Sequence, residues 1–282
     1  MARFDDPRLT PPAGDATPYQ VTAGVTAIRA APEPDGEMVT QALHGETVRV
    51  YREQGEFAEV QLVRDRYTGW ALMEALSAPV IETTHRVTAL RTYVFSEPDL
   101  KSAPRFLISL NSEVAVQGSE NGFSNCVRAG WVFDGHLAPR DRFESDPAAV
   151  AGRFLGTPYL WGGCESLGVD CTGLTRAAFA ACGVTLPRDS DMQFDWCGDA
   201  VDDWQQPGRL RRGDLVFWKG HVGIMMDSEQ LIHANAFHMA TAIEPLSGAV
   251  ARIAPRYGQP IGVRRIDLEA ARRHRPDWLA SA

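Results

Sequence analysis

The first half of the chain repeats itself once, over residues 21–137. Five short motifs occur in one copy and return in the same order in the next. The pairs are Val25–Arg29 with Val87–Arg91, Glu33–Asp35 with Glu97–Asp99, Glu46–Val50 with Ser112–Val116, Phe57 with Phe123, and Gly69–Leu72 with Gly130–Phe133. Each copy has short alternating runs broken at Gly, Asn, Asp and Pro, which is typical of a small β-barrel. The repeat predicts two barrels in tandem, and one larger all-β domain is the alternative.

The repeat also divides the chain of 282 residues. Residues 1–18 lack periodicity and are expected to form an extended arm. The two barrels are expected at 19–79 and 80–140, and a third domain at 141–282.

Helix and strand signals are mixed in the third domain, which predicts an α+β fold. Asp146 before Pro147 is typical of a helix start, and Gly183 of a helix end. The expected helices are 148–155, 171–182, a turn at 191–196 and 268–275; the expected strands are 215–218, 221–226, 230–235 and 261–266.

Composition excludes several classes of partner. A net charge of −8 argues against nucleic acid and anionic membrane, because both select basic surfaces. No apolar run reaches membrane-spanning length, and no secretory signal is visible after Met1. Five cysteines, an odd number, suit a reducing compartment. The chain is therefore expected to be cytoplasmic.

Cys171 is the candidate nucleophile. It follows Asp170 at the start of a helical pattern, where free N–H groups and the helix dipole favour a thiolate. Those N–H groups could also stabilise an oxyanion. A buried structural cysteine is the alternative, because free cysteines are often buried. Asp170 has two interpretations that stay open, a helix cap and a binder of a substrate ammonium group.

Two histidines provide the partner that a nucleophilic cysteine needs. If residues 227–229 form a three-residue turn, Gly223 pairs with His233 and His221 with Asn235. His221 and His233 then share a face as diagonal neighbours, roughly 7–8 Å apart, and Gly223 leaves space for His233. Cys171 would attack a carbonyl, His221 would pair with it and protonate the leaving amine, and His233 would orient His221.

A metal site is the other use of cysteine and histidine. The chain has no Cys-x-x-Cys pair, and Cys164, Cys171 and Cys182 are poorly spaced for structural zinc. We therefore expect no metal and no other cofactor. The remaining histidines form no constellation and are expected at the surface: His44, His85, His136, His238 and His274.

Six motifs of the third domain resemble the NlpC/P60 family of cysteine peptidases, over residues 147–266. They are Gly156–Gly163, Asp170–Leu174, Arg188–Ser190, Gly213–Phe217, His221–Ile224 and Ile232–Ala234. The Gly-Trp strand and the long Glu-Pro-Asp loop of each repeat resemble bacterial SH3 domains. With the six motifs and the two SH3-like repeats taken together, the chain resembles bacterial γ-D-glutamyl-diamino acid peptidases.

The resemblance implies a papain-like domain behind two SH3-like barrels, with Cys171, His221 and His233 as nucleophile, base and third member. It implies cleavage between γ-D-Glu and L-Lys or meso-diaminopimelate in murein peptides. The first barrel would wall the cleft, so that a free N-terminal L-Ala is needed and L-Ala-γ-D-Glu is released. The implied substrate-binding residues are Tyr159, Asp170, Thr172 and Ser190, with Glu33 and Tyr67 of the first repeat as looser counterparts.

Two positions depart from the family pattern. Thr172 replaces the usual serine, and Cys164–Ser166 replaces a loop that usually contains Ser-Pro, so that Glu165 adds charge near the cleft. The leading hypothesis is a cytoplasmic peptidase of murein-peptide recycling. The alternatives are an SH3-based wall-binding module with a silent catalytic domain and an acyltransferase on the same fold.

Overall fold

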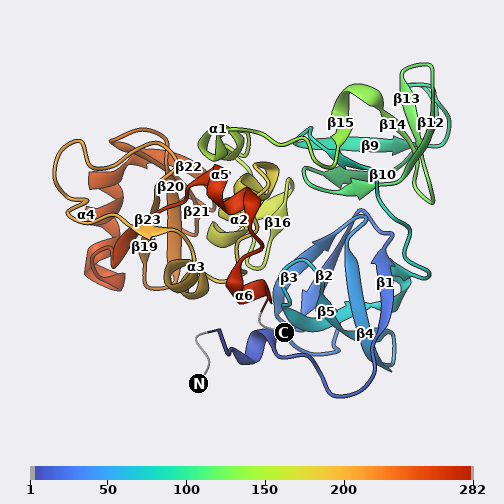
Figure 1. Cartoon of the computed structure of the whole chain (residues 1–282), viewed down its shortest axis with the longest axis horizontal. Helices are drawn as coiled ribbons and strands as arrows, with labels where there is room; N and C mark the ends of the chain where they lie inside the picture. Colours follow the sequence, from blue (N-terminus) through green and yellow to red (C-terminus); the bar gives the residue numbers. More distant parts are fainter. Residues whose placement is uncertain (1–3, 281–282) are drawn as a thin grey trace. The chain divides into compact units, whose positions relative to one another are not determined.

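The computed structural model describes residues 4–280 as two compact units (Figure 1). Contacts within the chain group residues 1–142 in an N-terminal unit and residues 143–282 in a C-terminal unit. The first unit is built almost wholly from strands, and the second combines helices with a sheet.

Part of the expected N-terminal arm is packed against the first sheet. Residues 1–3 lie outside the described residues, but a 3₁₀ helix, η1 (Pro7–Leu9), begins behind Asp6, which accepts the Arg8 backbone N–H at 2.9 Å. Leu9 is buried, and the Gln61 side chain donates to its carbonyl oxygen at 2.9 Å. The expectation of an extended arm is therefore wrong for this segment, because a single buried leucine anchors it.

The first repeat forms one antiparallel seven-stranded sheet. Its strand order is β3-β2-β6-β5-β4-β1-β7, so β1 lies between β4 and β7. A short 3₁₀ helix, η2 (Met73–Ala75), precedes the last strand. The strands are β1 (Thr17–Val21), β2 (Val25–Arg29), β3 (Met38–Leu43), β4 (Thr47–Gln54), β5 (Phe57–Leu62), β6 (Thr68–Leu72) and β7 (Leu76–Ser77).

The second repeat forms its own two sheets, of order β10-β9-β14-β13-β12 and β11-β8-β15. It buries its own apolar cluster, which includes Val94, Ile108 and Val132. The elements are β8 (His85–Val87), β9 (Arg91–Phe95), β10 (Pro104–Ser109), β11 (Glu113–Val114), β12 (Val116–Glu120), β13 (Phe123–Cys126), β14 (Gly130–Phe133), η3 (Asp134–His136) and β15 (Leu137–Pro139).

The two repeats share their strand connections. β8 pairs with β11 and β15 as β1 pairs with β4 and β7. The glycine before each tryptophan lies where two strands meet: a Cβ would come within 2.8 Å of the Arg29 carbonyl oxygen at Gly69, and within 2.5 Å of the Phe95 oxygen at Gly130. That the second repeat is an SH3-like barrel stays a prediction.

One motif pair was aligned wrongly. Val87–Arg91 begins at the last residue of β8 and ends at the first residue of β9, so it is not the counterpart of β2. The strand with the burial pattern of β2 is β9, in which Thr92 and Val94 are buried as Thr26 and Ile28 are in β2. The sequence match therefore pairs Val25 with Val87, whereas the burial pattern pairs Val25 with Arg91, four residues later.

The C-terminal unit is built on an antiparallel sheet of order β18-β23-β19-β20-β21-β22. Three strands and the late closing strand agree with the prediction within one residue at each end, whereas β16, β17, β18 and β22 were not predicted. The strands are β18 (Asp199–Ala200), β19 (Leu215–Trp218), β20 (His221–Met225), β21 (Gln230–Asn235), β22 (Ala240–Pro245) and β23 (Gly262–Arg265), with a separate pair, β16 (Cys164–Glu165) and β17 (Gly168–Val169).

Helices cover both faces of this sheet (Figure 1). The predicted helices are present, and α4 and α6 are additional. They are α1 (Pro147–Gly152), α2 (Cys171–Ala181), α3 (Ser190–Trp196), α4 (Leu246–Tyr257), α5 (Leu268–Arg273) and α6 (Asp277–Ala280). None of the described helices is long and apolar enough to cross a membrane.

Alternation along the strands gives the sheet two buried faces. Val216 and Trp218 of β19 pack with Leu246 and Ile253 of α4. Phe217, between them in sequence, contacts the ring of Phe194 in α3. α2 packs against β20 and β21 and is itself almost wholly buried. The first turn of α2 is therefore held in place by the packing of the helix against β20 and β21.

Candidate active site

The first turn of α2 is fixed by Asp170. The Asp170 carboxylate accepts the Gly173 N–H at 2.7 Å, so it is the N-cap of the helix, as one of the two interpretations predicted. A Cβ at Gly173 would lie 1.9 Å from the Gly163 carbonyl oxygen, so only glycine allows the loop to approach. Cys171 is thereby held as the first residue of the helix.

The Cys171 thiol is buried beside the backbone of β20. The backbone N–H groups of Val222 and Thr172 act to lower the pKa of its sulfur, which places the sulfur near the strand that begins with His221. Burial, followed by the charge of Asp170, raises the pKa of the Cys171 thiol to about 12. Burial and Asp170 therefore oppose the thiolate that the donors at the helix start favour.

The hairpin of β20 and β21 has the predicted register. Ile224 pairs with Ile232, and the Met226 N–H donates to the Gln230 carbonyl at 2.8 Å across the three-residue turn. A Cβ at Gly223 would meet the Leu231 side chain at 2.8 Å, so this glycine leaves space for Leu231 and not for His233.

The two predicted histidines are in direct contact. His221 Nε2 lies 2.8 Å from His233 Nδ1. His233 is fully buried, whereas His221, the first residue of β20, is partly exposed. The structure therefore brings together the two histidines, and their roles as base and orienting residue stay predictions.

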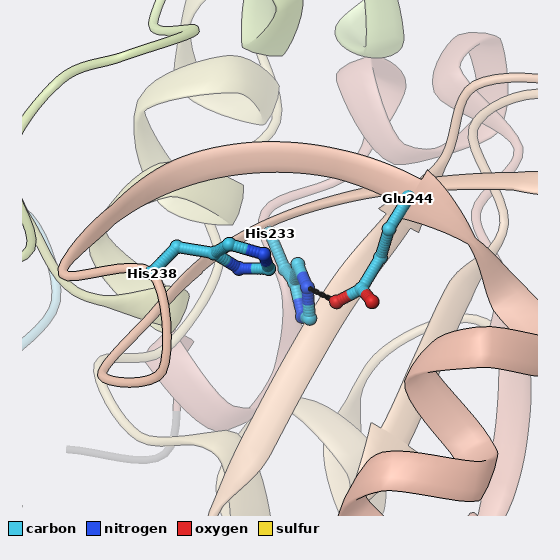
Figure 2. A group of neighbouring side chains, drawn as sticks. All are labelled: His233, His238 and Glu244. Carbon is cyan, nitrogen blue, oxygen red and sulfur yellow. Dashed lines mark hydrogen bonds and ion pairs between the residues drawn. The ribbon is translucent and has the colours of Figure 1, made fainter.

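Glu244 and Arg252 extend this pair and were missed in the sequence. His233 Nε2 lies 2.7 Å from Glu244 Oε1, and the Arg252 guanidinium pairs with the same carboxylate (Figure 2). The hydrogen bond from His233, followed by that from Arg252, lowers the pKa of Glu244 to about 2. Glu244 is thus an anion at neutral pH.

An anionic Glu244 sets the tautomer of both rings. A carboxylate only accepts hydrogen bonds, so His233 Nε2 carries a proton and its Nδ1 is an acceptor. His221 must then donate from Nε2, which leaves the lone pair on His221 Nδ1. Glu244, His233 and His221 thus form a hydrogen-bonded chain, called the histidine relay below. It leaves His221 Nδ1 able to accept a proton.

The surroundings of His221 favour its neutral form. Burial, followed by the charges of His233 and Arg252, lowers the pKa of His221 to about 3. Among residues 4–280, the Cys171 sulfhydryl makes no hydrogen bond to the His221 ring. Such bonds often form only when substrate is bound.

Arg188 neutralises the carboxylate beside the thiol. Its guanidinium contacts both Asp170 oxygens and the Thr172 hydroxyl, and it is almost fully buried. Thr172 donates to Asp170 at 3.0 Å, and the Gly162 N–H does so at 3.0 Å. Arg188 lies in a quoted motif, yet its role was not recognised, because the pairing joins residues 18 apart. Binding of a substrate ammonium group by Asp170 stays a prediction.

Tyr159 and Ser190 lie in the same unit as the nucleophile. Burial, followed by the charges of Cys171 and Asp170, raises the pKa of the Tyr159 phenol, so its ring lies near both groups. Its backbone N–H donates to the Met239 carbonyl at 3.0 Å. Ser190 is the first residue of α3 and is half-buried. Their contacts with substrate stay predictions.

The other two expected binding residues lie in the N-terminal unit. Glu33 is exposed on the loop between β2 and β3. Tyr67 is buried before β6, and its N–H donates to Asp65 at 3.1 Å. Their part in the site stays a prediction. Glu165 in the C-terminal unit is buried, and its place near the cleft stays a prediction.

Two histidines differ from the expectation of isolated surface residues. His44 is buried, with Nδ1 3.1 Å from the Thr22 carbonyl oxygen. His238 is exposed, but its ring lies beside His233 (Figure 2). One ligand atom each of His233, His238 and Glu244 lie within 4.8 Å of one another, a group that could hold a metal ion and contains no cysteine.

Known proteins resemble both parts of the chain. Residues 156–252 match the NlpC/P60 family, and residues 28–76 match the bacterial dipeptidyl-peptidase SH3 domain. The gamma-D-glutamyl-L-lysine dipeptidyl-peptidase of Bacillus subtilis is 28% identical over 232 residues, covering 71% of this chain and 73% of that protein. Dipeptidyl-peptidase 6 of Lysinibacillus sphaericus is 26% identical over 242 residues, covering 76% and 86%.

The architecture is shared with a solved structure. The crystal structure of an NlpC/P60 family protein from Bacillus cereus superposes with a TM-score of 0.74 at 22% identity, over 88% of this chain and 99% of that chain. At this identity the likeness shows the fold alone. The family matches show that this chain carries an NlpC/P60 domain at residues 156–252, with a bacterial dipeptidyl-peptidase SH3 domain ahead of it at residues 28–76.

Proposed function

We propose that the protein hydrolyses the bond between γ-D-Glu and a diamino acid, L-Lys or meso-diaminopimelate, in cell-wall peptides. The observation that carries the proposal is the hydrogen-bonded relay of His221, His233 and Glu244, which begins at the strand next to the Cys171 thiol. The names of the two similar dipeptidyl-peptidases support this substrate class.

The geometry suits acyl transfer through a thioester. The Cys171 sulfur attacks the γ-carbonyl carbon while its proton passes to His221 Nδ1. The Cys171 backbone N–H, which has no hydrogen-bond partner among residues 4–280, is a donor for the oxyanion that forms. His221 then returns the proton to the departing amine of the diamino acid, and water releases the γ-D-glutamyl product by the reverse sequence.

We further propose that the substrate carries a free N-terminal L-Ala and that L-Ala-γ-D-Glu is released. Tyr159, Asp170, Thr172 and Ser190 are the residues proposed for the amino end. Because Arg188 already neutralises Asp170, the ammonium group would have to join a network rather than pair with an isolated carboxylate. Glu33 and Tyr67 are proposed to complete this end from the N-terminal unit.

The cellular setting is part of the proposal. A peptidase that requires a free amino terminus acts on released peptides, so murein-peptide recycling in the cytoplasm is the setting we propose. The net charge of −8 agrees with a peptide substrate rather than nucleic acid or an anionic membrane surface.

The test compares L-Ala-γ-D-Glu-L-Lys-D-Ala with the same peptide acetylated at its amino terminus, with products identified by mass spectrometry. We expect L-Ala-γ-D-Glu from the free peptide only. Cys171→Ala should abolish turnover, and Cys182→Ala, a buried cysteine at the other end of α2, should retain it.

Each outcome bears on a separate part of the proposal. Equal cleavage of both peptides would overturn the free-amine requirement while leaving the peptidase activity. No cleavage of either peptide would overturn the substrate class. Transfer of the dipeptide to an added amine in preference to water would identify an acyltransferase instead.

A further inference from the structure

Three potential metal ligands converge at the outer end of the histidine relay. They come from β21, from the turn that follows it and from β22, and Figure 2 shows the His238 ring facing His233 with Glu244 on the far side of His233. His233 is buried, Glu244 is partly buried and His238 is exposed, so an ion can reach the group from solvent on the His238 side.

The His238 ring has a nitrogen available for a metal. Asn235 Oδ1 accepts the His238 backbone N–H at 2.9 Å and lies 3.0 Å from His238 Nδ1. The Asn235 amide NH₂ points to the His233 carbonyl at 3.4 Å, which identifies the oxygen as the atom that faces His238. His238 Nδ1 must therefore donate, and the lone pair lies on its Nε2.

Glu244 likewise has a free oxygen. His233 and Arg252 both contact Oε1. Oε2 makes no hydrogen bond with any of the residues that the structure describes. One carboxylate oxygen can therefore bind a cation while the other keeps its contact with Arg252.

The donor set selects a class of ion. Two imidazoles and one carboxylate, with a fourth position open to water, suit zinc and similar transition-metal ions rather than magnesium or calcium. Tetrahedral coordination with bonds of about 2.1 Å brings ligand atoms roughly 3.4 Å apart. One ligand atom of each residue already lies within 4.8 Å of the others, so a swing of the exposed His238 side chain closes the site.

We propose that a zinc-like ion binds to His233 Nε2, His238 Nε2 and Glu244 and switches the peptidase off by reversing the histidine relay. A metal on His233 Nε2 requires the His233 proton to move to Nδ1. His233 then donates to His221 Nε2, and the His221 proton moves to Nδ1. The number of protons is unchanged, but His221 now presents an N–H where it had a lone pair, and it cannot accept the proton of Cys171.

Binding does not depend on the proposed substrate, so it is tested first. Zn²⁺ is titrated calorimetrically into Cys171→Ala, which removes the thiolate as a competing ligand, and into the same protein with His238→Ala. We expect the double variant to bind at least tenfold more weakly. Equal affinities would overturn the site, and Cys171→Ala with His274→Ala, another exposed histidine, is the matched control.

The switch has its own readout. In ¹⁵N–¹H correlation spectra of Cys171→Ala, added Zn²⁺ should move the proton of His221 from Nε2 to Nδ1. An unchanged His221 tautomer at full occupancy would overturn the relay reversal even if the ion binds.

The activity measurement rests on the proposed function. Wild-type and His238→Ala proteins are compared, each relative to its own rate without metal. The concentration of Zn²⁺ that halves the rate should rise at least tenfold in His238→Ala, whereas equal inhibition would place the inhibitory ion elsewhere, such as on Cys171. If no peptide is cleaved, the calorimetric and spectroscopic results still decide the inference.

Discussion

At the scale of single residues, Glu244 determines which nitrogen of His221 can act as a base. Its carboxylate accepts from His233 and fixes the proton positions of both rings. In Glu244→Gln the amide can either accept from or donate to His233, so part of the population has the wrong tautomers. We expect kcat to fall roughly 10–100-fold with little change in KM.

Steady-state kinetics on the free peptide measure this effect. Glu229→Gln, an exposed glutamate at the β20–β21 turn, is the control and should behave as wild type. An unchanged kcat in Glu244→Gln would show that His221 keeps its tautomer without the carboxylate.

The Cys171 thiol should ionise only at high pH in the absence of substrate. Its pKa is raised to about 12 by burial and then by Asp170. The rate of alkylation by iodoacetamide should therefore keep rising from pH 6 to pH 9, because only the thiolate reacts. Mass spectrometry of the Cys171 peptide gives the rate at each pH. A rate that is constant across this range would indicate a thiolate stabilised by His221.

At the scale of elements, the start of α2 depends on a buried ion pair. Arg188 and Asp170 are both almost fully buried, and each is the other's charge partner. Arg188→Met leaves the Asp170 carboxylate uncompensated and should lower the free energy of unfolding by about 3–5 kcal/mol. Asp170→Asn with Arg188→Met should recover part of this loss, because no buried charge then remains.

Urea denaturation followed by tryptophan fluorescence compares these variants. Arg256→Met, on the exposed side of α4, should change stability by no more than about 0.5 kcal/mol. If the double variant is no more stable than Arg188→Met, the loss reflects packing of the arginine and not the unpaired charge.

The sequence was sufficient where a local rule decides the structure. The length of the turn at 227–229 set the parity of the hairpin, and the contact of His221 with His233 followed from it. Asp146 and Asp170 were identifiable as helix caps from their place before an apolar period.

The elements that were not predicted from the sequence have no such local signal. α4 contains Gly248 and Pro255 and begins behind Pro245 without a side-chain cap, so its intrinsic helix propensity is low. It forms because Leu246, Ala249 and Ile253 are buried against the sheet. Glu244 and Arg252 lie on β22 and α4, which were not predicted, and their roles therefore could not be inferred from the sequence.

At the scale of the whole molecule, buried neutral histidines make the fold sensitive to acid. The pKa of His221 is lowered to about 3, and those of His233 and His44 are also lowered, in each case chiefly by burial. The unfolded chain binds protons near pH 6.5 that the folded chain does not, so stability falls as the pH drops from about 6.5 toward 3.

For His221 alone the loss between pH 7.5 and pH 5 is about 2 kcal/mol. Urea midpoints at the two pH values measure it, and both compact units should be affected because His44 lies in the first and His221 in the second. His221→Gln should reduce the loss. A midpoint independent of pH would contradict burial of these rings in the neutral form.

In the tandem repeat, matching sequence motifs identify most but not all of the equivalent strands. Three of its motif pairs lie at the beginning of equivalent strands or within one residue of it, whereas the first pair is displaced by four residues. Shared strand connections, rather than matching letters, relate the two halves.

The exposed turn between β20 and β21 has a consequence for protein engineering. Asp227 fixes its three residues by accepting the Glu229 and Gln230 N–H groups, each at 2.7 Å. Surface turns of this kind usually tolerate insertions, tags and randomised libraries. Here a one-residue insertion that shifted the pairing would turn His233 to the other side of the sheet. Loop grafting should therefore avoid residues 227–229, although they lie outside the catalytic relay.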